Sequence, residues 1–384
     1  MPQKFMISPF SEEHELFREQ LRRFLEKELV PHVMEWEENK YFPDEVFRQT
    51  GAMGCHGILI PEEYGGSAGD YLMAAVWCEE MARLAGGVSA GLGMHAFIVL
   101  PAIARHGTEE QRQRLLVPGV KGEKIGALGL SEPGAGSDLA NIRTVARREG
   151  DHYILNGSKT FITNGKRADF VLVLCKTDPQ AGYKGFSTLI VEKGMAGFTQ
   201  GRTLEKLGWH SGDTAELSFE DVRVPAENLL GQEGLGFYNA MTNLEWERLI
   251  MALGTVKAAQ WAFDKTKTYV LQREAFGKPI GKFQVNRHKM VDMAMEIEAA
   301  RQLTYHALRL LVNGEACAAE VSMAKIFCAR MGDFVATTCL QLHGGYGYMR
   351  EYEIERIFRD LRINAIGGGT SEILKEIVGR MMGL

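Results

Sequence analysis

The sequence lacks the features of several common classes of protein. Its six cysteines form no CxxC pair and show no His/Cys spacing typical of zinc, so we expect buried thiols and no metal site. Met1–Phe10 has neither an apolar signal core nor an Arg-rich amphipathic presequence, which predicts a cytoplasmic protein, with a processed mitochondrial matrix form as the alternative. The longest apolar run, residues 88–104, is interrupted by His95 and Pro101, so we expect no membrane span.

Basic charge is also scarce. The net charge is −5, and the two densest basic clusters, Arg143–Arg148 and Arg356–Arg362, are interleaved with acidic or apolar residues. A nucleic-acid-binding protein would normally show a concentrated basic stripe, so we expect no nucleic acid as a partner. The hydrophobic content of 45% and the charged content of 24% are typical of a globular protein, and 384 residues exceed what one compact core usually accommodates.

The first third of the chain, residues 1–122, has the pattern of a helical domain. Apolar residues recur at helical spacing, for example over Tyr71–Leu84. Thr108 and Gln111 are the two partners of a helix-capping box, because the threonine hydroxyl can accept a backbone amide while the glutamine side chain reaches back.

The pattern changes to that of a β-domain over residues 123–233. Short β-rich runs at 171–174 and 186–191 are bounded by turn residues. Asn156-Gly157 and Asn164-Gly165 predict tight turns, since both dipeptides favour backbone with positive φ. We expect a small β-barrel or sandwich here.

The remainder, residues 234–384, is helical again. Long periodic stretches predict helices over 236–271, 283–311 and 315–342, and a shorter one after Thr370. Their lengths and short connections suit a four-helix bundle. The fold class predicted is therefore α+β multidomain, with an N-terminal α-helical domain, a middle β-barrel or sandwich domain and a C-terminal four-helix bundle.

A glycine-rich motif, LGLSEPGAGSD, occupies residues 128–138. It predicts a strand that runs into a loop, where Gly134 and Gly136 would let a ligand approach the backbone closely. Ser131 and Ser137 would offer hydroxyl groups to that ligand. The residues alone are equally compatible with a plain surface loop.

A second motif, FITNG, occupies residues 161–165 and predicts a strand that ends in a tight turn. Thr163 could donate a hydrogen bond to a flat, acceptor-rich ring system, and Phe161 could cover one face of that ring. Taken alone, the motif favours a half-buried strand without a ligand.

Two further motifs lie in the C-terminal third. In QREAFG, residues 272–277, Arg273 beside Phe276 suits a diphosphate next to an aromatic ring, while Gly277 suits a helix C-terminus, and both can be true. The motif QLHGGYGY, residues 341–348, lacks the G-x-G-x-x-G spacing and follows a helix instead of a strand. It therefore predicts a glycine-rich turn that exposes backbone amides, not a Rossmann fingerprint.

Together with GGGTSEI at residues 367–373, these motifs in this order resemble the acyl-CoA dehydrogenase family. The resemblance covers nearly the whole chain, and residues 341–379 are most similar to the long-chain and isovaleryl branches. It implies FAD as cofactor, an acyl-CoA substrate, an electron-transferring flavoprotein as electron acceptor, and a homotetramer built as a dimer of dimers.

The resemblance also implies roles for individual residues. The isoalloxazine ring and its neighbourhood would be contacted by Leu130, Ser131, Phe161 and Thr163, with Thr370 and Glu372 along the same flavin. The diphosphate and adenosine of the neighbouring subunit's FAD would be contacted by Arg273, Phe276, Gln284, Gln341 and Gly345. The substrate would be contacted by Ser137, at its pantetheine arm, and by Arg248.

The activity that the resemblance implies is α,β-desaturation of a fatty acyl-CoA to a trans-2-enoyl-CoA. A carboxylate removes the α-proton, and flavin N5 accepts the β-hydrogen as hydride. Many family members carry this carboxylate in the loop where this chain has Gly368. Gly368 still has its backbone N–H, which by position would donate to the thioester oxygen.

The same resemblance suggests where the base lies. In the long-chain and isovaleryl branches it belongs to a Glu-Arg pair on a helix of the bundle, and Glu247-Arg248 stands at the matching separation, 25 residues before Arg273. We therefore predict Glu247 as the base, with a pKa raised by desolvation. The competing Glu245 would point from a different helix face. The alternative is that Glu247 has no catalytic role, because a glutamate on a helix is usually solvated or paired with a charged neighbour at i+3 or i+4.

The substrate is predicted less sharply. Medium-to-long straight acyl chains are favoured, and a branched short chain, as in isovaleryl-CoA, is the alternative. An oxidase of the same fold is a further alternative. A nucleic-acid-binding flavoprotein associated with repair is disfavoured by the net charge of −5.

Overall fold

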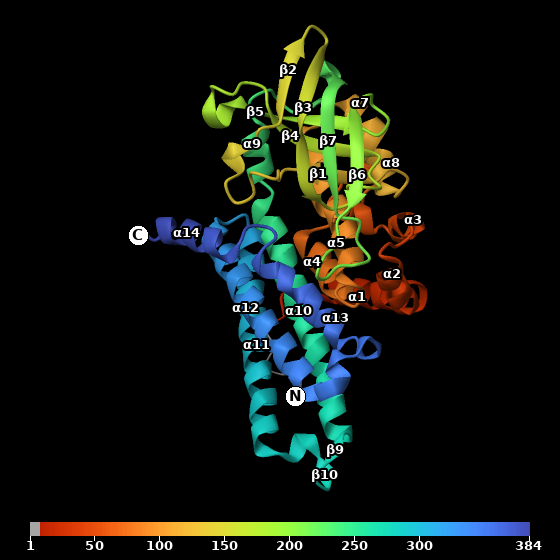
Figure 1. Cartoon of the computed structure of the whole chain (residues 1–384), viewed down its shortest axis with the longest axis vertical. Coiled ribbons are helices and arrows are strands. Elements are labelled where there is room, and N and C mark those ends of the chain that lie inside the picture. The colour runs from red at the N-terminus through yellow and green to blue at the C-terminus, as the bar shows by residue number, and fades with distance from the viewer. Residues whose placement is uncertain (1–7) are drawn as a thin grey trace.

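The computed structural model describes residues 8–384 and shows a helical region, a sheet and a second helical region in series (Figure 1). The prediction that Met1–Phe10 holds no targeting segment falls largely outside the described residues. The sheet lies at one end of the long axis, and the longest helices extend toward the other end (Figure 1).

The N-terminal region contains short and medium helices. They are α1 (Glu12–Phe24), α2 (Val33–Asn39), α3 (Glu45–Ala52), α4 (Tyr71–Met81), α5 (Gly86–Met94), α6 (Leu100–His106), α7 (Glu109–Gln111) and α8 (Val117–Val120). The capping box is confirmed: the Thr108 hydroxyl accepts from the Gln111 N–H at 3.2 Å, and the Gln111 side chain accepts from the Thr108 N–H at 3.1 Å. This cap fixes the start of the helical turn that packs under the sheet.

The expectation that no apolar run is long enough to cross a membrane was wrong. Among the described residues, Gly86–His106 has the length and apolarity to do so, because a π-helical turn at His95–Val99 joins α5 to α6 into 21 helical residues. Two-thirds of this segment is buried inside the fold. His95 donates to the Gly119 carbonyl at 2.9 Å and accepts from the Gly126 N–H at 3.1 Å, so the residue that interrupts the run in sequence is satisfied internally.

The middle region is one hydrogen-bonded sheet of eight strands. Their bounds are β1 (Gly126–Gly129), β2 (Val145–Glu149), β3 (His152–Ile162), β4 (Phe170–Lys176), β5 (Phe186–Glu192), β6 (Phe198–Thr203), β7 (Ala215–Pro225) and β8 (Leu229–Leu230). The order is β6-β7-β3-β2-β4-β5-β8, with β1 parallel to β4. β4 is buried on both faces: Val171 and Val173 belong to the core of the sheet, while Phe170 and Leu172 pack against α6 and its neighbours.

One predicted turn in this region was wrong. Asn156-Gly157 lies inside β3, where the pairing with β7 shifts register. Gly157 has φ +147°, and a side chain there would place its Cβ 2.4 Å from the Thr144 hydroxyl, so the glycine serves a β-bulge. The Asn164-Gly165 turn is present after β3, but only Asn164 has positive φ, at +61°.

The C-terminal region consists of long helices. Its elements are α9 (Gly236–Met241), α10 (Leu244–Gln272), α11 (Gln284–Val312), α12 (Ala318–His343), α13 (Ile354–Leu361) and α14 (Ser371–Met381). The helix predicted over 236–271 is broken at Thr242-Asn243, and α13 falls in a stretch for which no helix was predicted. The three long helices pack against one another, while α13 and α14 both pack on α12.

The prediction that Gly277 of the QREAFG motif forms a helix C-terminus was wrong. α10 stops at Gln272, and Glu274-Ala275 (β9) pairs with Lys278-Pro279 (β10) in a hairpin. Phe276 and Gly277, with φ of +52° and +77°, form the two-residue turn of that hairpin, so Gly277 does not close the helix. The hairpin lies at the far end of the bundle from the sheet (Figure 1).

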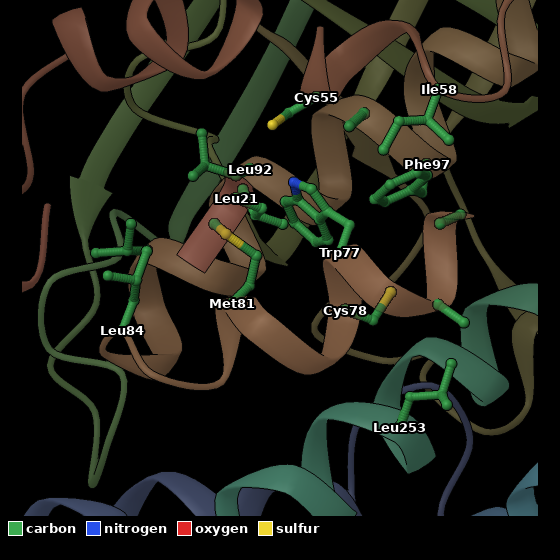
Figure 2. Packing of buried hydrophobic residues seen from close by; sticks show 14 of the residues in the cluster. Leu21, Cys55, Ile58, Trp77, Cys78, Met81, Leu84, Leu92, Phe97 and Leu253 are labelled. Atoms are coloured by element: carbon green, nitrogen blue, oxygen red, sulfur yellow. The ribbon is translucent and has the colours of Figure 1, made fainter. Parts of the chain in front are cut away.

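The N-terminal helices and the bundle share one hydrophobic core. Trp77 and Cys78 of α4 and Phe97 of the π-helical turn belong to the same cluster as Trp246 and Leu253 of α10. Figure 2 shows Leu253 on its helix beside Cys78. All six cysteines are free and buried, as predicted. This shared core fixes the first turns of α10 against the helices under the sheet.

Candidate active site

Glu247 lies in the first turn of α10, which packs against the N-terminal helices. Its carboxylate is half-buried and accepts from the Asn243 amide at 3.5 Å, and the same amide donates to the Phe97 carbonyl at 3.1 Å. Burial raises the pKa of Glu247 to about 7, against the opposing effects of the Asn243 hydrogen bond and the Arg248 charge. A carboxylate with this pKa is a stronger base than a solvated glutamate.

Glu245, the competing candidate, points elsewhere. Its carboxylate accepts from the thiol of Cys317, just before α12, at a distance of 3.6 Å. It therefore lies on a different face of α10 from Glu247.

Gly368 lies opposite the same part of α10. A Cβ added to Gly368 would stand 2.7 Å from the sulfur of Met251, which is one helical turn beyond Glu247. Gly368 has φ +65° and Gly369 has φ +96°, so the loop uses the backbone freedom of glycine at both positions. Within the described residues, the Gly368 N–H has no hydrogen-bond acceptor. Among the described residues, the loop thus presents an unpaired donor toward the part of α10 that carries Glu247.

Two buried basic side chains, those of Arg248 and Lys325, lie near this loop. The Arg248 side chain is 8% exposed, and its Nε has no hydrogen-bond partner among the described residues. Lys325 of α12 is 1% exposed, and its ammonium donates to the Gly367 carbonyl at 2.6 Å and to the Gly369 carbonyl. Burial, together with the nearby Arg248 charge, lowers the pKa of Lys325 to about 8.

The loop that carries Leu130 and Ser131 is held by β3. The buried Lys159 donates to the Leu130 carbonyl and to the Glu132 carboxylate, both at 2.9 Å. The Thr160 N–H donates to the Ser131 carbonyl at 2.9 Å. These bonds bring the LSEPGAGSD and FITNG motifs side by side.

The surface formed by these two motifs fits a flat ring. Phe161 has φ +60°, which is strained for an aromatic residue, and it is 70% exposed. In the described structure the Ser131 and Thr163 hydroxyls have no hydrogen-bond partner. A Cβ at Gly134 would meet nothing within 4 Å, and the same holds for Gly136, so internal packing does not explain either glycine. An exposed ring, free hydroxyls and an open glycine loop are what an isoalloxazine ring would require.

The remaining residues predicted near the flavin and substrate lie in the glycine-rich loop and at the start of α14. Ser137 is exposed in the glycine-rich loop. The Thr370 hydroxyl caps α14 by accepting from the Ile373 N–H at 3.2 Å. Glu372 lies in the first turn of α14, close enough for its charge to act on Lys325.

A second group of predicted residues lies far from the first. It comprises Arg273, Phe276, Gln284, Gln341 and Gly345, all at the hairpin end of the bundle. Phe276 is 95% exposed at the hairpin tip, and the Arg273 guanidinium lies 5.6 Å from the ring centre of Tyr346. Because a helix rises 1.5 Å per residue, Glu247 and Arg273 are about 40 Å apart along α10. The structure therefore brings the predicted site residues together in two groups, at opposite ends of one helix.

Sequence reasoning missed several residues that shape the site. Asn243 donates to Glu247, and Met251 faces Gly368. Lys159, two residues before the FITNG motif, donates to Leu130 of the LSEPGAGSD motif, and Lys325 donates to the Gly368 loop. For Lys325 a signal was present, since a lysine amid the apolar residues of a predicted core helix needs a polar partner. Its partners are 42 and 44 residues away, so the sequence alone did not name them.

Three family descriptions match the chain. "Acyl-CoA dehydrogenase, N-terminal domain" matches residues 11–123, the middle domain matches 127–222 and the C-terminal domain matches 234–383. These matches define the class of protein: an oxidoreductase that acts on a CH–CH bond of an acyl-CoA, with FAD as the cofactor of the class.

Relatives agree with this class. The long-chain specific acyl-CoA dehydrogenase of Mus musculus mitochondria is 43% identical over 97% of this chain and 87% of its own length. The short-chain specific enzyme of Clostridium acetobutylicum is 43% identical over 95% and 97%. The isovaleryl-CoA dehydrogenase of Oryza sativa subsp. japonica mitochondria is 38% identical over 97% and 91%. The chain belongs to the acyl-CoA dehydrogenase family.

Solved structures share the fold. An acyl-CoA dehydrogenase from Geobacillus kaustophilus has a TM-score of 0.96, with 46% identity over 99% of this chain and 100% of that one. A chain from a study of the electron transferring flavoprotein of Acidaminococcus fermentans has a TM-score of 0.94, with 40% identity over 98% and 99%. The prolyl acyl carrier protein oxidase AnaB has a TM-score of 0.91, with 29% identity over 98% and 100%.

Proposed function

We propose that this protein desaturates fatty acyl-CoA thioesters between the α- and β-carbons, with Glu247 as the base. One observation carries the proposal: the half-buried carboxylate of Glu247 lies on α10, and the facing loop has no carboxylate but presents the Gly368 N–H, which has no acceptor among the described residues. The base and the hydrogen-bond donor thus come from two elements that face each other.

The α-proton of a thioester is weakly acidic, so its removal needs help at the carbonyl oxygen. Glu247 would take this proton while the Gly368 N–H donates to the oxygen, where negative charge develops. Asn243 keeps Glu247 in place through its second bond to the Phe97 carbonyl. The apolar packing of Trp246 and Phe97 around the start of α10 limits access of water to the carboxylate.

FAD, when bound, would accept the hydrogen and electron pair that leave the β-carbon. Leu130, Ser131, Phe161 and Thr163 would hold its ring, and Thr370 and Glu372 would lie along it. The group formed by Arg273, Phe276, Gln284, Gln341 and Gly345 would bind the diphosphate and adenosine. Because the two groups are about 40 Å apart along α10, each chain would hold the ring of one FAD and the diphosphate of a neighbour's.

The substrate class favoured is a medium-to-long straight acyl chain. The support is the base on α10 and the similarity of residues 341–379 to the long-chain branch. The relatives with 43% identity include a long-chain and a short-chain enzyme, and an isovaleryl enzyme follows at 38%. A branched short chain is therefore the second candidate. Ser137 and Arg248 are the proposed substrate contacts.

The proposed partners follow from this activity. An electron-transferring flavoprotein would reoxidise the cofactor, and a homotetramer built as a dimer of dimers would complete each FAD site. Location in the cytoplasm, or in a mitochondrial matrix after processing, stays a prediction.

The test is a panel of acyl-CoA thioesters of graded length and branching, assayed with the purified flavoprotein and an artificial electron acceptor. Anaerobic bleaching of the flavin by straight chains of medium or greater length is the expected result. A preference for isovaleryl-CoA would select the second candidate. Rapid oxygen consumption without an added acceptor would instead indicate an oxidase, as the similarity to AnaB allows.

A further inference from the structure

Lys325 is a buried ammonium whose hydrogen bonds go to backbone carbonyls. It lies on α12 with 1% of its surface exposed, and in the described structure no carboxylate stands within ion-pair distance of its Nζ. Nearby charges are those of Arg248, which repels it, and Glu372, which attracts it. Burying an ammonium without a counter-ion is costly, so a purely structural reason for this lysine is weak.

The two carbonyls that Lys325 binds flank Gly368. They belong to Gly367, at 2.6 Å, and to Gly369. The Gly367 carbonyl and the Gly368 N–H are parts of one peptide unit, and the peptide bonds of the described residues are all trans. In a trans peptide the C=O and the N–H point in opposite directions. An ammonium on the oxygen therefore turns the N–H away from α12.

The same contact changes the strength of the donor. A cation bound to a peptide oxygen draws electron density from the amide, and hydrogen bonds in such a chain strengthen one another. The N–H at the other end becomes a better donor. Among residues 8–384 the Gly368 N–H has no hydrogen-bond acceptor, so the polarised donor is available to a ligand.

We propose that Lys325 is a positioning residue that orients and polarises the Gly367–Gly368 peptide, so that the Gly368 N–H binds the thioester oxygen of the substrate. The inference rests on the proposed function and adds to it a residue that touches neither the substrate nor the cofactor. Lys325 acts through the Gly367–Gly368 peptide, whose N–H stabilises the negative charge that develops on the thioester oxygen.

The test compares Lys325→Met, which has a similar length and no donor, with the parent holoenzyme. The readout is the carbonyl stretch of a bound 2-enoyl-CoA with a ¹³C-labelled thioester, isolated by isotope-edited infrared difference spectroscopy. In the parent the stretch should fall below that of the free thioester, and in Lys325→Met it should return most of the way to the free value. With saturated substrate, kcat should fall about 10- to 100-fold while KM changes little, since removing a whole donor of this kind costs about 10²–10³-fold.

Lys257→Met is the matched control. Lys257 is a partly buried lysine of α10 whose charge pairs with Glu79 and Glu80, away from the loop. The Lys257→Met variant should have a lower melting temperature than the parent enzyme, with no shift of the carbonyl stretch. If Lys325→Met does not yield folded flavoprotein, Lys325→Gln, with an uncharged and shorter donor, should show a partial return of the stretch.

An unchanged carbonyl stretch in the folded Lys325 variants would overturn the proposal. Failure of the proposed function is a separate result, because the parent enzyme itself would then show no bleaching with any acyl-CoA. A parent that bleaches, together with variants whose stretch does not move, contradicts only the role of Lys325.

Discussion

At the scale of single residues, the base can be tested directly. Glu247→Gln keeps the shape of the side chain and its contact with Asn243 but cannot take a proton. We expect the rate of anaerobic flavin bleaching by acyl-CoA to fall by about 10²–10⁴-fold, the usual contribution of a positioned base. Glu245→Gln is the control, because Glu245 contacts Cys317 on another face of the helix, and it should bleach at nearly the parent rate. Fast bleaching by Glu247→Gln would remove this residue from the mechanism.

The protonation of Glu247 should appear in the pH dependence of the rate. Burial raises the pKa of Glu247 to about 7, and only the ionised form can accept the α-proton. The single-turnover rate should therefore be low at pH 5 and rise through about pH 7 to a plateau. A stopped-flow pH series measures this, and a rate that is flat from pH 5 to 8 would be inconsistent with Glu247 as the base.

Gly368 can be tested by trying to restore the carboxylate to its loop. In Glu247→Gln, adding Gly368→Glu should recover little activity, because the new side chain meets the Met251 sulfur and a backbone with φ +65°. The strain at such a position is of the order of 1–3 kcal/mol. Adding Met251→Ala should raise the bleaching rate above that of the double variant. Full recovery in the double variant would show that Met251 is no obstacle.

At the scale of elements, His95 links the Gly86–His106 helices to the sheet. Burial lowers its pKa to about 4, while an unfolded histidine titrates near 6.5. Between these values the unfolded chain binds more protons, so stability falls as the pH drops from 6.5 to 4, by up to about 3 kcal/mol. Thermal melts across this range should show a flatter profile for His95→Gln. The exposed His32→Gln should keep the steep profile, and an equally steep profile for His95→Gln would contradict the assignment.

The elements also show what a sequence can predict. Hydrophobic periodicity predicted the long helices. The Thr108 capping box was predicted correctly because all of its partners lie within four residues. The turn predicted at Asn156-Gly157 was wrong because Gly157 is required by its close approach to the Thr144 hydroxyl on the neighbouring segment. A local sequence pattern does not contain this contact. Lys325 was missed for the same reason, since its partners lie on a loop that only the tertiary fold brings to α12. Glu247 was predicted as the base only because a resemblance supplied the distance to Arg273, and this prediction stays to be tested.

At the scale of the whole molecule, the two groups of cofactor residues predict complementation between subunits. Glu247→Gln removes the base, and Arg273→Ala weakens the diphosphate site at the other end of α10. If each FAD site takes its ring contacts from one chain and its diphosphate contacts from a neighbour, one of the two sites in each mixed pair of neighbouring chains combines two intact halves. Co-expression of the two variants with different tags should therefore restore bleaching in the doubly purified protein. Activity no higher than that of either variant alone would show that each chain binds its own FAD.

The packing of Gly368 against Met251 has a consequence for the placement of the base. If Glu247 is the base, the loop needs no catalytic side chain, and Met251 occupies the space that a side chain at position 368 would need. A variant of this chain with its base in the loop would need changes at position 368, at position 251 and at Glu247. Each variant on the way would either have a loop side chain crowded by Met251 or have two carboxylates next to the α-carbon of the substrate. No single substitution therefore converts one arrangement into the other, so the Gly368–Met251 contact would separate the two kinds of active site by several simultaneous changes.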